Sequence, residues 1–390
     1  MGKIIKKIGL GLSLIIAVPV VLLIRAIRPL VLIRFGKLPS GRIGQLTCYP
    51  QNYFCERAAG MQPPAFDIFY HTRPVCNEQL KKMWDRTLRV WQFAEILGKS
   101  NRYVPGGEAH VVPLTSSDRD IHGLMLRPGA VLSFRPEEER QGREQLKKYG
   151  VSQEDSIVCL HSRSPDYLQE AFPDNDWKYH SYRDSQMKDF IPAVEELARR
   201  KHYIFRVGAF TKDPLMTSEQ RIIDYSLNGR TDFMDIYLGS KCRFYLGDSC
   251  GIAAVPMIFR RPLALANIIP LEWTLTWSPD YLFIPKKLWL KQERRFLMFR
   301  EILESGVGRQ YLRSHQYEKA GIEVINNTAD EIKDLAIEMD ERLNKTWQST
   351  QEDEELQAQF WKFFKTSQLH NVLLARIGTV FLRQNRALLG

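Results

Sequence analysis

The sequence predicts an α/β fold with a doubly wound parallel sheet, and three observations support this prediction. Short apolar runs typical of buried strands recur after residue 150. Segments with helical spacing of apolar residues lie between them, as over Met187–Lys201. A capping box, Thr328 to Glu331, marks the start of a further helix over Glu331–Leu343. Such alternation is typical of a parallel sheet with helices on both faces. The expected strands are Ile157–Leu160, Tyr203–Val207, Cys242–Leu246, Leu263–Ala266, Tyr281–Ile284 and Ile322–Ile325.

The part of the chain before residue 150 carries a weaker pattern of the same kind. Phe66–Tyr70 has the composition of a buried strand, and Asn77–Leu97 carries an apolar stripe at helical spacing. Val111–Leu114 and Ala130–Phe134 are short strand candidates. These segments predict a second, smaller α/β domain.

Positive charge is concentrated at the two ends of the chain. Eight of the 55 lysines and arginines precede the first acidic residue, Glu56, and five follow the last one, Glu355. The other 42 bases face 45 acids, so the body of the protein is slightly acidic. A nucleic-acid-binding protein would carry its basic surface on the body, so no nucleic-acid partner is expected. Basic ends instead predict contact with an anionic membrane surface.

The N-terminus also holds an apolar run, Ile8–Ile24, which has 17 uncharged residues between lysines and arginines. This length is the lower limit for crossing a bilayer. No small-residue cleavage site follows the run, which disfavours a cleaved signal peptide. We therefore expect a membrane-inserted or re-entrant anchor.

The six cysteines include no C-x-x-C pair, so neither a zinc site nor a redox dithiol is expected. The sequence lacks an HExxH motif, and a loop is enough to explain the acids of Asp174-Asn175-Asp176, so we predict no metal site and no cofactor. A reducing compartment is the simpler interpretation of so few cysteines.

These features divide the chain into four expected parts. An amphipathic stripe near the C-terminus either docks on the protein or lies on lipid. The parts are a membrane-associated anchor over 1–37, an N-terminal acceptor-side α/β domain over 38–150, a C-terminal nucleotide-sugar-binding α/β domain over 151–345, and a linker with a helical tail over 346–390.

Polar residues follow three of the predicted strands. His161 and Arg163 follow the first strand, Arg206 and Gly208 end the second, and the turn Asp248–Gly251 follows the third. Ligands of parallel α/β sheets bind at the carboxyl ends of the strands. We therefore expect these residues to line one site.

The turn Asp248–Gly251 is predicted to open a helix, whose first amides and dipole suit a phosphate. Ser249 is the N-cap of this helix, a phosphate ligand, or both, and Pro256 predicts that the helix is short or bent. An ordinary strand-to-helix connection is the alternative interpretation.

Four further features have alternative interpretations. Arg163 is the first candidate for a pyrophosphate contact, because a guanidinium binds two oxygens at once, and an internal salt bridge is the alternative. His161 either serves a phosphate or a proton transfer, or is structural. Asp235 either contacts a ribose or lies on a solvated helix face. The glycine-punctuated turn around Arg42 either approaches a ligand or is a turn that leads into a strand.

Several short motifs follow one another along the chain in an order that resembles a family of bacterial glycosyltransferases found with surface-polysaccharide and lipopolysaccharide synthesis genes. The likeness spans about residue 40 to the end. More distantly, His161-x-Arg163 resembles the nucleotide-diphosphate motif of fucosyltransferases with a GT-B-type fold. The motifs are Arg42-Ile43-Gly44, Val158 to Arg163, Tyr182-Arg183, Arg206-Val207-Gly208, Ile223-Asp224-Tyr225, Asp232 to Ile236, Leu246 to Gly251, Ile284-Pro285-Lys286, and Ile377-Gly378 with Phe381-Leu382 and Asn385.

The resemblance implies a GT-B-like fold, in which two Rossmann-like domains face a cleft and the second holds a nucleotide sugar without an essential metal. The family often has His where Gln45 stands, so the base must come from another residue; Cys250 also replaces a small residue. The eligible bases are Glu56, Asp67, His71, Glu108, Asp118 and Asp120. The candidate site residues are His161 and Arg163 for catalysis, Arg206, Gly208, Asp235, Asp248, Ser249, Cys250 and Gly251 for donor binding, and Gly41, Arg42 and Gly44 at the opposite lip.

We therefore expect a glycosyltransferase on the cytoplasmic face of the bacterial inner membrane. It would move a sugar from a nucleotide-diphosphate donor to a lipid-linked or surface-polysaccharide acceptor. One alternative is a non-catalytic, membrane-tethered module that binds a nucleotide sugar. The other alternative is an epimerase or hydrolase acting on the sugar nucleotide.

Overall fold

A computed structural model describes residues 16–114, 119–127, 129–365 and 369–390. The chain divides into two compact units, which are described separately. Unit 1 runs to residue 118 and includes Arg127–Phe134. Unit 2 comprises Arg119–Leu126 and Arg135–Gly390. That the two units face a common cleft stays a prediction.

Unit 1 is built on two parallel strands that pair from Ile33 opposite Phe66 to Leu38 opposite His71. An isolated bridge extends this pair on each side, to Val111 and to Val90. The elements are β1 (Ile33–Leu38), α2 (Ile43–Ala58), β2 (Phe66–His71), α3 (Glu78–Thr87), α4 (Ala94–Asn101) and the 3₁₀ helix η1 (Gly107–His110).

Two sequence predictions for unit 1 are wrong in detail. The helix expected over Asn77–Leu97 is two helices, α3 and α4, because the chain between them bridges to β2 through Phe69 and Val90. The segment Ala130–Phe134 contains no strand. The strand expected over Phe66–Tyr70 is confirmed as β2.

The N-terminal membrane anchor is the prediction that the structure contradicts, and with it the localisation on the inner membrane. Residues 1–15, which hold half of the apolar run, lie outside the described residues. The rest of the run lies in a helix over 16–26, and no described helix is long and apolar enough to cross a bilayer. Arg25, near the end of this helix, donates to the side chain of Asn101 over 2.9 Å and to the carbonyl of Val104 over 2.8 Å. The helix is therefore tied to the body of unit 1.

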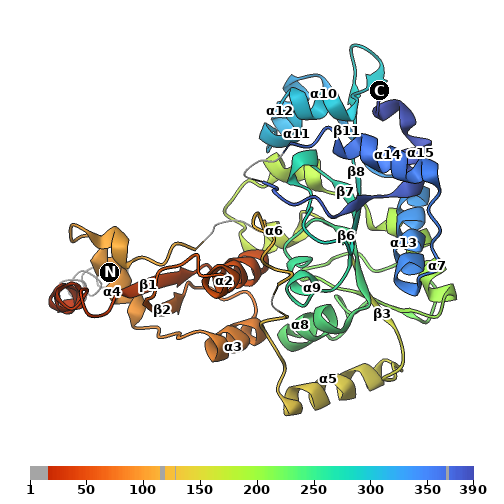
Figure 1. The fold of residues 1–390 in the computed structure, drawn as a ribbon. Coiled ribbons are helices and arrows are strands. Elements are labelled where there is room, and N and C mark those ends of the chain that lie inside the picture. The colour runs from red at the N-terminus through yellow and green to blue at the C-terminus, as the bar shows by residue number, and fades with distance from the viewer. Residues whose placement is uncertain (1–15, 115–118, 128, 366–368) are drawn as a thin grey trace. The chain divides into compact units, whose positions relative to one another are not determined.

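Unit 2 contains a seven-stranded sheet in the order β12-β8-β7-β6-β3-β4-β5, and all its neighbouring strands are parallel. Helices α7 and α13 pack together on one face, and α8 and α9 lie on the other (Figure 1). The predicted parallel α/β fold is therefore confirmed. The strands are β3 (Ile157–His161), β4 (Tyr203–Arg206), β5 (Ile222–Ile223), β6 (Phe244–Asp248), β7 (Leu263–Ile268), β8 (Tyr281–Pro285) and β12 (Arg376–Ile377).

The helices of unit 2 begin with α5, which precedes the sheet. The α-helices are α5 (Pro136–Lys148), α6 (Asp166–Ala171), α7 (Ile191–Arg199), α8 (Asp232–Lys241), α9 (Ala254–Ile258), α10 (Phe299–Glu304), α11 (Val307–Gln310), α12 (Ser314–Lys319), α13 (Ala329–Asn344), α14 (Gln351–Trp361) and α15 (Thr379–Gln384). The 3₁₀ helices are η2 (Lys178–Arg183), η3 (Met187–Phe190), η4 (Leu271–Trp273) and η5 (Arg386–Leu388).

One predicted strand belongs to a different sheet. Ile322–Ile325 is β11, but it pairs antiparallel with β9 (Lys287–Leu290), which also pairs with β10 (Arg295–Phe296). The sequence pattern predicts this strand correctly but does not show which strand it pairs with.

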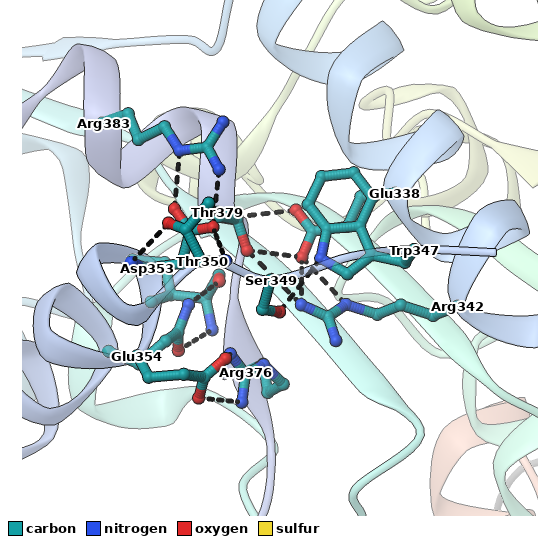
Figure 2. A network of polar contacts seen from close by, with 12 residues as sticks. Glu338, Arg342, Trp347, Ser349, Thr350, Asp353, Glu354, Arg376, Thr379 and Arg383 are labelled. Carbon is teal, nitrogen blue, oxygen red and sulfur yellow. Dashed lines mark hydrogen bonds and ion pairs between the residues drawn. The ribbon is translucent and has the colours of Figure 1, made fainter. Parts of the chain in front are cut away.

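The C-terminal tail docks on unit 2, where β12 forms the edge strand of the large sheet beside β8. Figure 2 shows the polar contacts that hold it. The buried carboxylate of Glu338 accepts from the amide and the hydroxyl of Thr379, both over 2.7 Å. Arg383 donates to both oxygens of the buried Asp353, over 2.6 and 2.5 Å. These bonds join α15 to α13 and α14.

Candidate functional site

The sheet of unit 2 has a point at which the chain reverses its direction of growth. From β3 the chain adds β4 and β5 on one side, and it then crosses to the other side of β3 to add β6, β7 and β8. The reversal lies between β3 and β6, which pair from Val158 opposite Phe244 to His161 opposite Gly247. Ligands of open α/β sheets bind at such a point, outside the carboxyl ends of the strands.

Asp248, the last residue of β6, organises this edge of the sheet. Its fully buried carboxylate accepts from the backbone amide of Arg163 over 2.6 Å, from the hydroxyl of Ser185, and from the side-chain amide of Asn267 over 3.2 Å. The ends of β3, β6 and β7 and the loop containing Ser185 therefore meet at one carboxylate. Ser185 also shares a hydrogen bond with Ser162 over 2.9 Å.

Three cationic side chains gather beside this carboxylate. The guanidinium of Arg163 is paired with Asp184. Arg183 donates to the carbonyl of Ser249 over 2.8 Å. The ammonium of Lys286, directly after β8, donates to the carbonyls of Tyr182 and Asp184 over 2.9 and 2.7 Å. These three residues form one cationic cluster, which we define as Arg163 after β3, Arg183 at the end of η2, and Lys286 after β8.

The pKa shifts of the residues in and beside the cationic cluster indicate that its positive charges are close together and poorly hydrated. Burial lowers the pKa of Lys286 to about 8, although Asp248 and Asp184 partly oppose this change. Burial and the neighbouring Arg183 also lower the pKa of Arg163. Burial raises the pKa of Asp184 and of Asp248, although their basic neighbours oppose it. A bound anion would relieve the mutual repulsion of the three cations.

His161 lies at the same edge and contacts the turn after β6. Its Nδ1 bonds to the carbonyl of Val207 over 2.8 Å, and its ring interacts with the thiol of Cys250. Burial lowers the pKa of His161, but Cys250 and the Val207 carbonyl more than offset this, so the pKa is raised. Gly208 leaves room for the ring, because a Cβ there would stand 2.8 Å from Nδ1 and the backbone has φ +126°.

The turn after β6 differs from the prediction in one respect. Ser249 and Cys250 are half-buried and Gly251 is exposed, but α9 begins only at Ala254 and ends at Ile258. The short helix expected from Pro256 is confirmed. The helix does not start at the turn, so a helix dipole contributes little to phosphate binding there. The cationic cluster is the stronger feature of the site.

The structure places two of the predicted donor-binding residues in internal ion pairs. Arg206 is buried, and its guanidinium bonds to Asp224 over 3.2 Å and to the carbonyl of Asp213 over 2.6 Å. Asp235, on α8, is buried and pairs with Arg230 over 2.7 Å. Burial raises the pKa of Asp235 to about 7 in spite of Arg230. Neither side chain belongs to the Asp248 network.

The sequence analysis did not predict Lys286 and Arg183 as site residues. Both lie within motifs that carry the resemblance to the glycosyltransferase family. Lys286 follows a predicted strand directly, so the strand-end rule that selects Arg163 also selects it. Arg183 lies in the long connection from β3 to α7, and no sequence signal places it beside Ser249.

The predicted lip residues Gly41, Arg42 and Gly44 belong to unit 1. Gly41 and Arg42 lie between β1 and α2, at the carboxyl end of β1, and Gly44 lies in the first turn of α2. The turn leads into a helix, so the alternative prediction of a turn that enters a strand is wrong. Arg42 precedes α2 without a side-chain capping bond. Their position relative to the cationic cluster stays a prediction.

The candidate bases differ in burial and in their contacts. Asp67 is buried and is bound by Arg34 and Arg57 over 2.7 Å each. His71 is also buried, and its two nitrogens contact Ser40 over 2.7 Å and Asp85 over 2.9 Å. Glu56 is half-buried and Glu108 is exposed. Asp120 belongs to unit 2 and accepts two backbone amides, and Asp118 lies outside the described residues.

Within the described ranges, no group of three or more His, Cys, Asp or Glu side chains could hold a metal ion.

No protein-family model matches the chain, and no curated protein matches it.

The solved structures that resemble the chain include two glycosyltransferases. One is the ADP-heptose lipopolysaccharide heptosyltransferase II of Escherichia coli, with 15% identity, a TM-score of 0.37, and coverage of 65% of this chain and 90% of the other. The second is a glycosyl transferase of family 9 from Veillonella parvula, with 10% identity, a TM-score of 0.35, and coverage of 60% and 80%.

Proposed function

We propose that the protein is a glycosyltransferase that binds the diphosphate of a nucleotide sugar at the edge of the sheet where β3 and β6 end. The observation that carries this proposal is the cationic cluster of Arg163, Arg183 and Lys286 at the reversal point of a parallel sheet. Two linked phosphoryl groups match such a cluster in charge. The ordered sequence motifs support the transfer of a sugar as the reaction.

The cluster would act mainly on the leaving group. When the bond between the sugar and the diphosphate breaks, negative charge grows on the departing phosphoryl oxygen. Fixed cations in a poorly hydrated site stabilise that charge without reorganisation. Arg163 is held through its own backbone amide by Asp248, and Lys286 is held by two carbonyls, so both are fixed before the donor binds.

The acceptor, a lipid-linked or surface glycan, would be activated by a base from unit 1. Glu56 and Glu108 are the preferred candidates, because Glu56 is half-buried and Glu108 is exposed, whereas Asp67 and His71 are buried.

Calorimetry against a panel of nucleotide sugars, followed by assay of nucleotide release with an acceptor extract, tests the proposal. The wild type is expected to bind one donor and to release its nucleotide only when acceptor is present. Arg163→Ala should abolish binding, whereas Arg199→Ala, at an exposed position, should not change it. Undiminished donor binding by Arg163→Ala refutes its role. Binding without turnover would favour a non-catalytic module, and product release without acceptor would favour a hydrolase or an epimerase.

A further inference from the structure

Phe210, in the loop after β4, has a backbone conformation that is unusual for a bulky residue. Its φ is +57°, in the left-handed region, where a side chain with a Cβ is strained. Glycine or asparagine would adopt this conformation at lower cost. The other described non-glycine residues with a left-handed backbone are polar: Lys201, Arg260, Asn267, Arg294 and Lys345.

Burial of the Phe210 side chain does not offset this strain. The side chain is 48% exposed, and its ring lies 5.8 Å from the ring of Tyr167, which is half-buried on α6. Strained backbone conformations cluster at ligand-binding sites, where the surrounding structure holds them in place. The exposed ring is therefore a candidate ligand contact.

The loop that carries this ring is held by the buried pair of Arg206 and Asp224. Arg206 donates to the carbonyl of Asp213 over 2.6 Å and to the carboxylate of Asp224 over 3.2 Å. The same carboxylate accepts from the backbone amide of Leu215 over 2.9 Å. Both members of the pair are thus bonded to the loop. This explains how the strained backbone is maintained, and it gives Arg206 a role other than the predicted contact with the donor.

The aromatic pair lies at the edge of the sheet where the diphosphate is proposed to bind. Phe210 follows β4, and Tyr167 lies on α6, which follows β3. The ammonium of Lys212, in the same loop, lies 3.8 Å from the carboxylate of Asp166 on α6. In the sheet, β3 stands between β4 and β6. The aromatic pair is therefore beside the proposed diphosphate position, on the side of β3 opposite to β6.

We propose that Phe210, packed on Tyr167, stacks on the nucleobase of the donor, and that Arg206 and Asp224 are positioning residues that hold its loop; this inference rests on the proposed function. Every nucleobase has a flat aromatic face that stacks on such a ring. A phenyl ring offers no hydrogen-bond partner to the hydroxyls of the donor sugar, which favours the base as its contact.

The test is calorimetry of the full-length protein with inorganic pyrophosphate, uridine diphosphate and adenosine diphosphate. Base–aromatic stacking predicts that Phe210→Asn raises the Kd of the nucleoside diphosphates about fivefold to a hundredfold and leaves the Kd of pyrophosphate unchanged. Phe210→Trp keeps an aromatic face and should retain the wild-type affinities. Because asparagine tolerates the left-handed backbone, Phe210→Asn should not lower the midpoint of urea unfolding.

Two control variants separate stacking from other effects of the substitution. Phe93→Asn removes a phenyl ring that is 59% exposed in unit 1, and Arg294→Asn changes an exposed residue with φ +51°. Neither variant should change either Kd.

Two further variants extend the test to the surroundings of the ring. If Phe210→Asn does not fold, Tyr167→Leu should raise the Kd of the nucleoside diphosphates in the same direction, since it removes the ring on which Phe210 packs. Asp224→Asn weakens the pair with Arg206 and should also raise this Kd without changing that of pyrophosphate. An unchanged Kd in Asp224→Asn, beside a raised one in Phe210→Asn, overturns the positioning role.

The remaining outcomes distinguish this inference from the proposed function. If wild type and Phe210→Asn bind pyrophosphate and the nucleoside diphosphates equally well, the stacking is overturned and the proposed function stands. An equal rise in Kd for pyrophosphate and the nucleoside diphosphates also overturns the stacking, because the ring would then shape the anion site. Loss of a nucleotide sugar with unchanged nucleoside diphosphate binding assigns the ring to the sugar and overturns the base contact. A wild type that binds none of these ligands overturns the proposed function, and the inference with it.

Discussion

The backbone amide of Arg163 donates to the carboxylate of Asp248 over 2.6 Å, and this bond joins the ends of the two strands between which the sheet reverses its direction. The two residues are 85 positions apart in the chain. Asp248 does not need to touch a ligand to matter, because it fixes the backbone from which the Arg163 side chain extends. A positioning role of this kind predicts effects on both stability and binding.

Asp248→Ala should destabilise the protein strongly. It would leave three donors without their acceptor: the Arg163 amide, the Ser185 hydroxyl and the Asn267 amide group. Each unsatisfied buried group costs about 1–3 kcal/mol, so a loss of about 3 kcal/mol or more is expected in the free energy of unfolding from urea titration. Asp330→Ala, at an exposed position, should stay within about 0.5 kcal/mol of the wild type. Equal stabilities of the two variants would contradict the role of Asp248.

Arg183→Met should weaken anion binding while the fold is retained. Arg183 is half-buried and contacts Ser249 through the backbone carbonyl alone. Loss of one charged hydrogen bond to a phosphate costs about 1.5–3 kcal/mol, which corresponds to a rise of about tenfold to a hundredfold in Kd. Calorimetry with inorganic pyrophosphate measures this rise. Arg300→Met, at an exposed position, is the matched control, and an identical Kd for both variants would exclude Arg183 from the anion site.

The affinity for a nucleotide sugar should fall as the pH rises from 7 to 9. Both phosphates of such a donor are esterified, so the charge of the ligand is constant over this range. Burial lowers the pKa of Lys286 to about 8, so in the protein without ligand Lys286 loses its charge above that pH. Lys286 must then take up a proton when the donor binds. Ionisation of Cys250 near pH 7 adds negative charge and acts in the same direction.

The expected loss of affinity approaches tenfold per pH unit above pH 8, because one proton is taken up on binding. Calorimetry in buffers of different ionisation enthalpy measures this proton uptake directly. An affinity that is constant or that rises between pH 7 and 9 would contradict the place of Lys286 in the cluster.

Arg383→Ala should loosen the C-terminal tail. The hydrogen bonds of Arg383 lower the pKa of Asp353 to about 2. Because this pKa is depressed in the folded state, the pair stabilises the fold above about pH 4, and the contribution is lost as the pH falls from about 4 to 2. At pH 7 the variant should lose about 1–2 kcal/mol, a value reduced because Arg383 is partly exposed.

Thermal and urea unfolding at pH 7 and at pH 3 check the effect on the tail, and the difference from the wild type should shrink at the lower pH. Arg386→Ala removes an exposed pair with Glu352 and should have little effect. If Arg386→Ala lowers the free energy of unfolding more than Arg383→Ala does, the pair of Arg383 with Asp353 is not the main attachment of the tail.

The sequence predicts the centre of the large sheet well because its strands are continuous apolar runs. The strands β3, β4, β7 and β8 lie within one or two residues of the predicted ranges. The edge strand β12 has only two residues, one of them Arg376, so it has no such pattern. Its place in the sheet depends on contacts with β8 that are distant in sequence.

For the candidate site too, local sequence predicts some features, and contacts between residues distant in sequence decide the others. Arg163 and Ser249 are predicted from strand ends alone, and the structure brings these ends together because β3 and β6 are neighbours. Strand order is a property of the whole sheet, so the sequence cannot show that Arg206 turns toward Asp224 instead. The apolar N-terminal run illustrates a further limit, because hydropathy alone does not reveal that Arg25 ties its helix to Asn101.

The most direct measurement is a crystal structure of the protein with a bound nucleotide sugar or nucleoside diphosphate. The diphosphate is expected at the carboxyl ends of β3 and β6, within hydrogen-bond distance of Arg163 or Arg183 and beside Ser249. A diphosphate bound elsewhere on the protein, with the ends of β3 and β6 occupied by water alone, would contradict the proposed site.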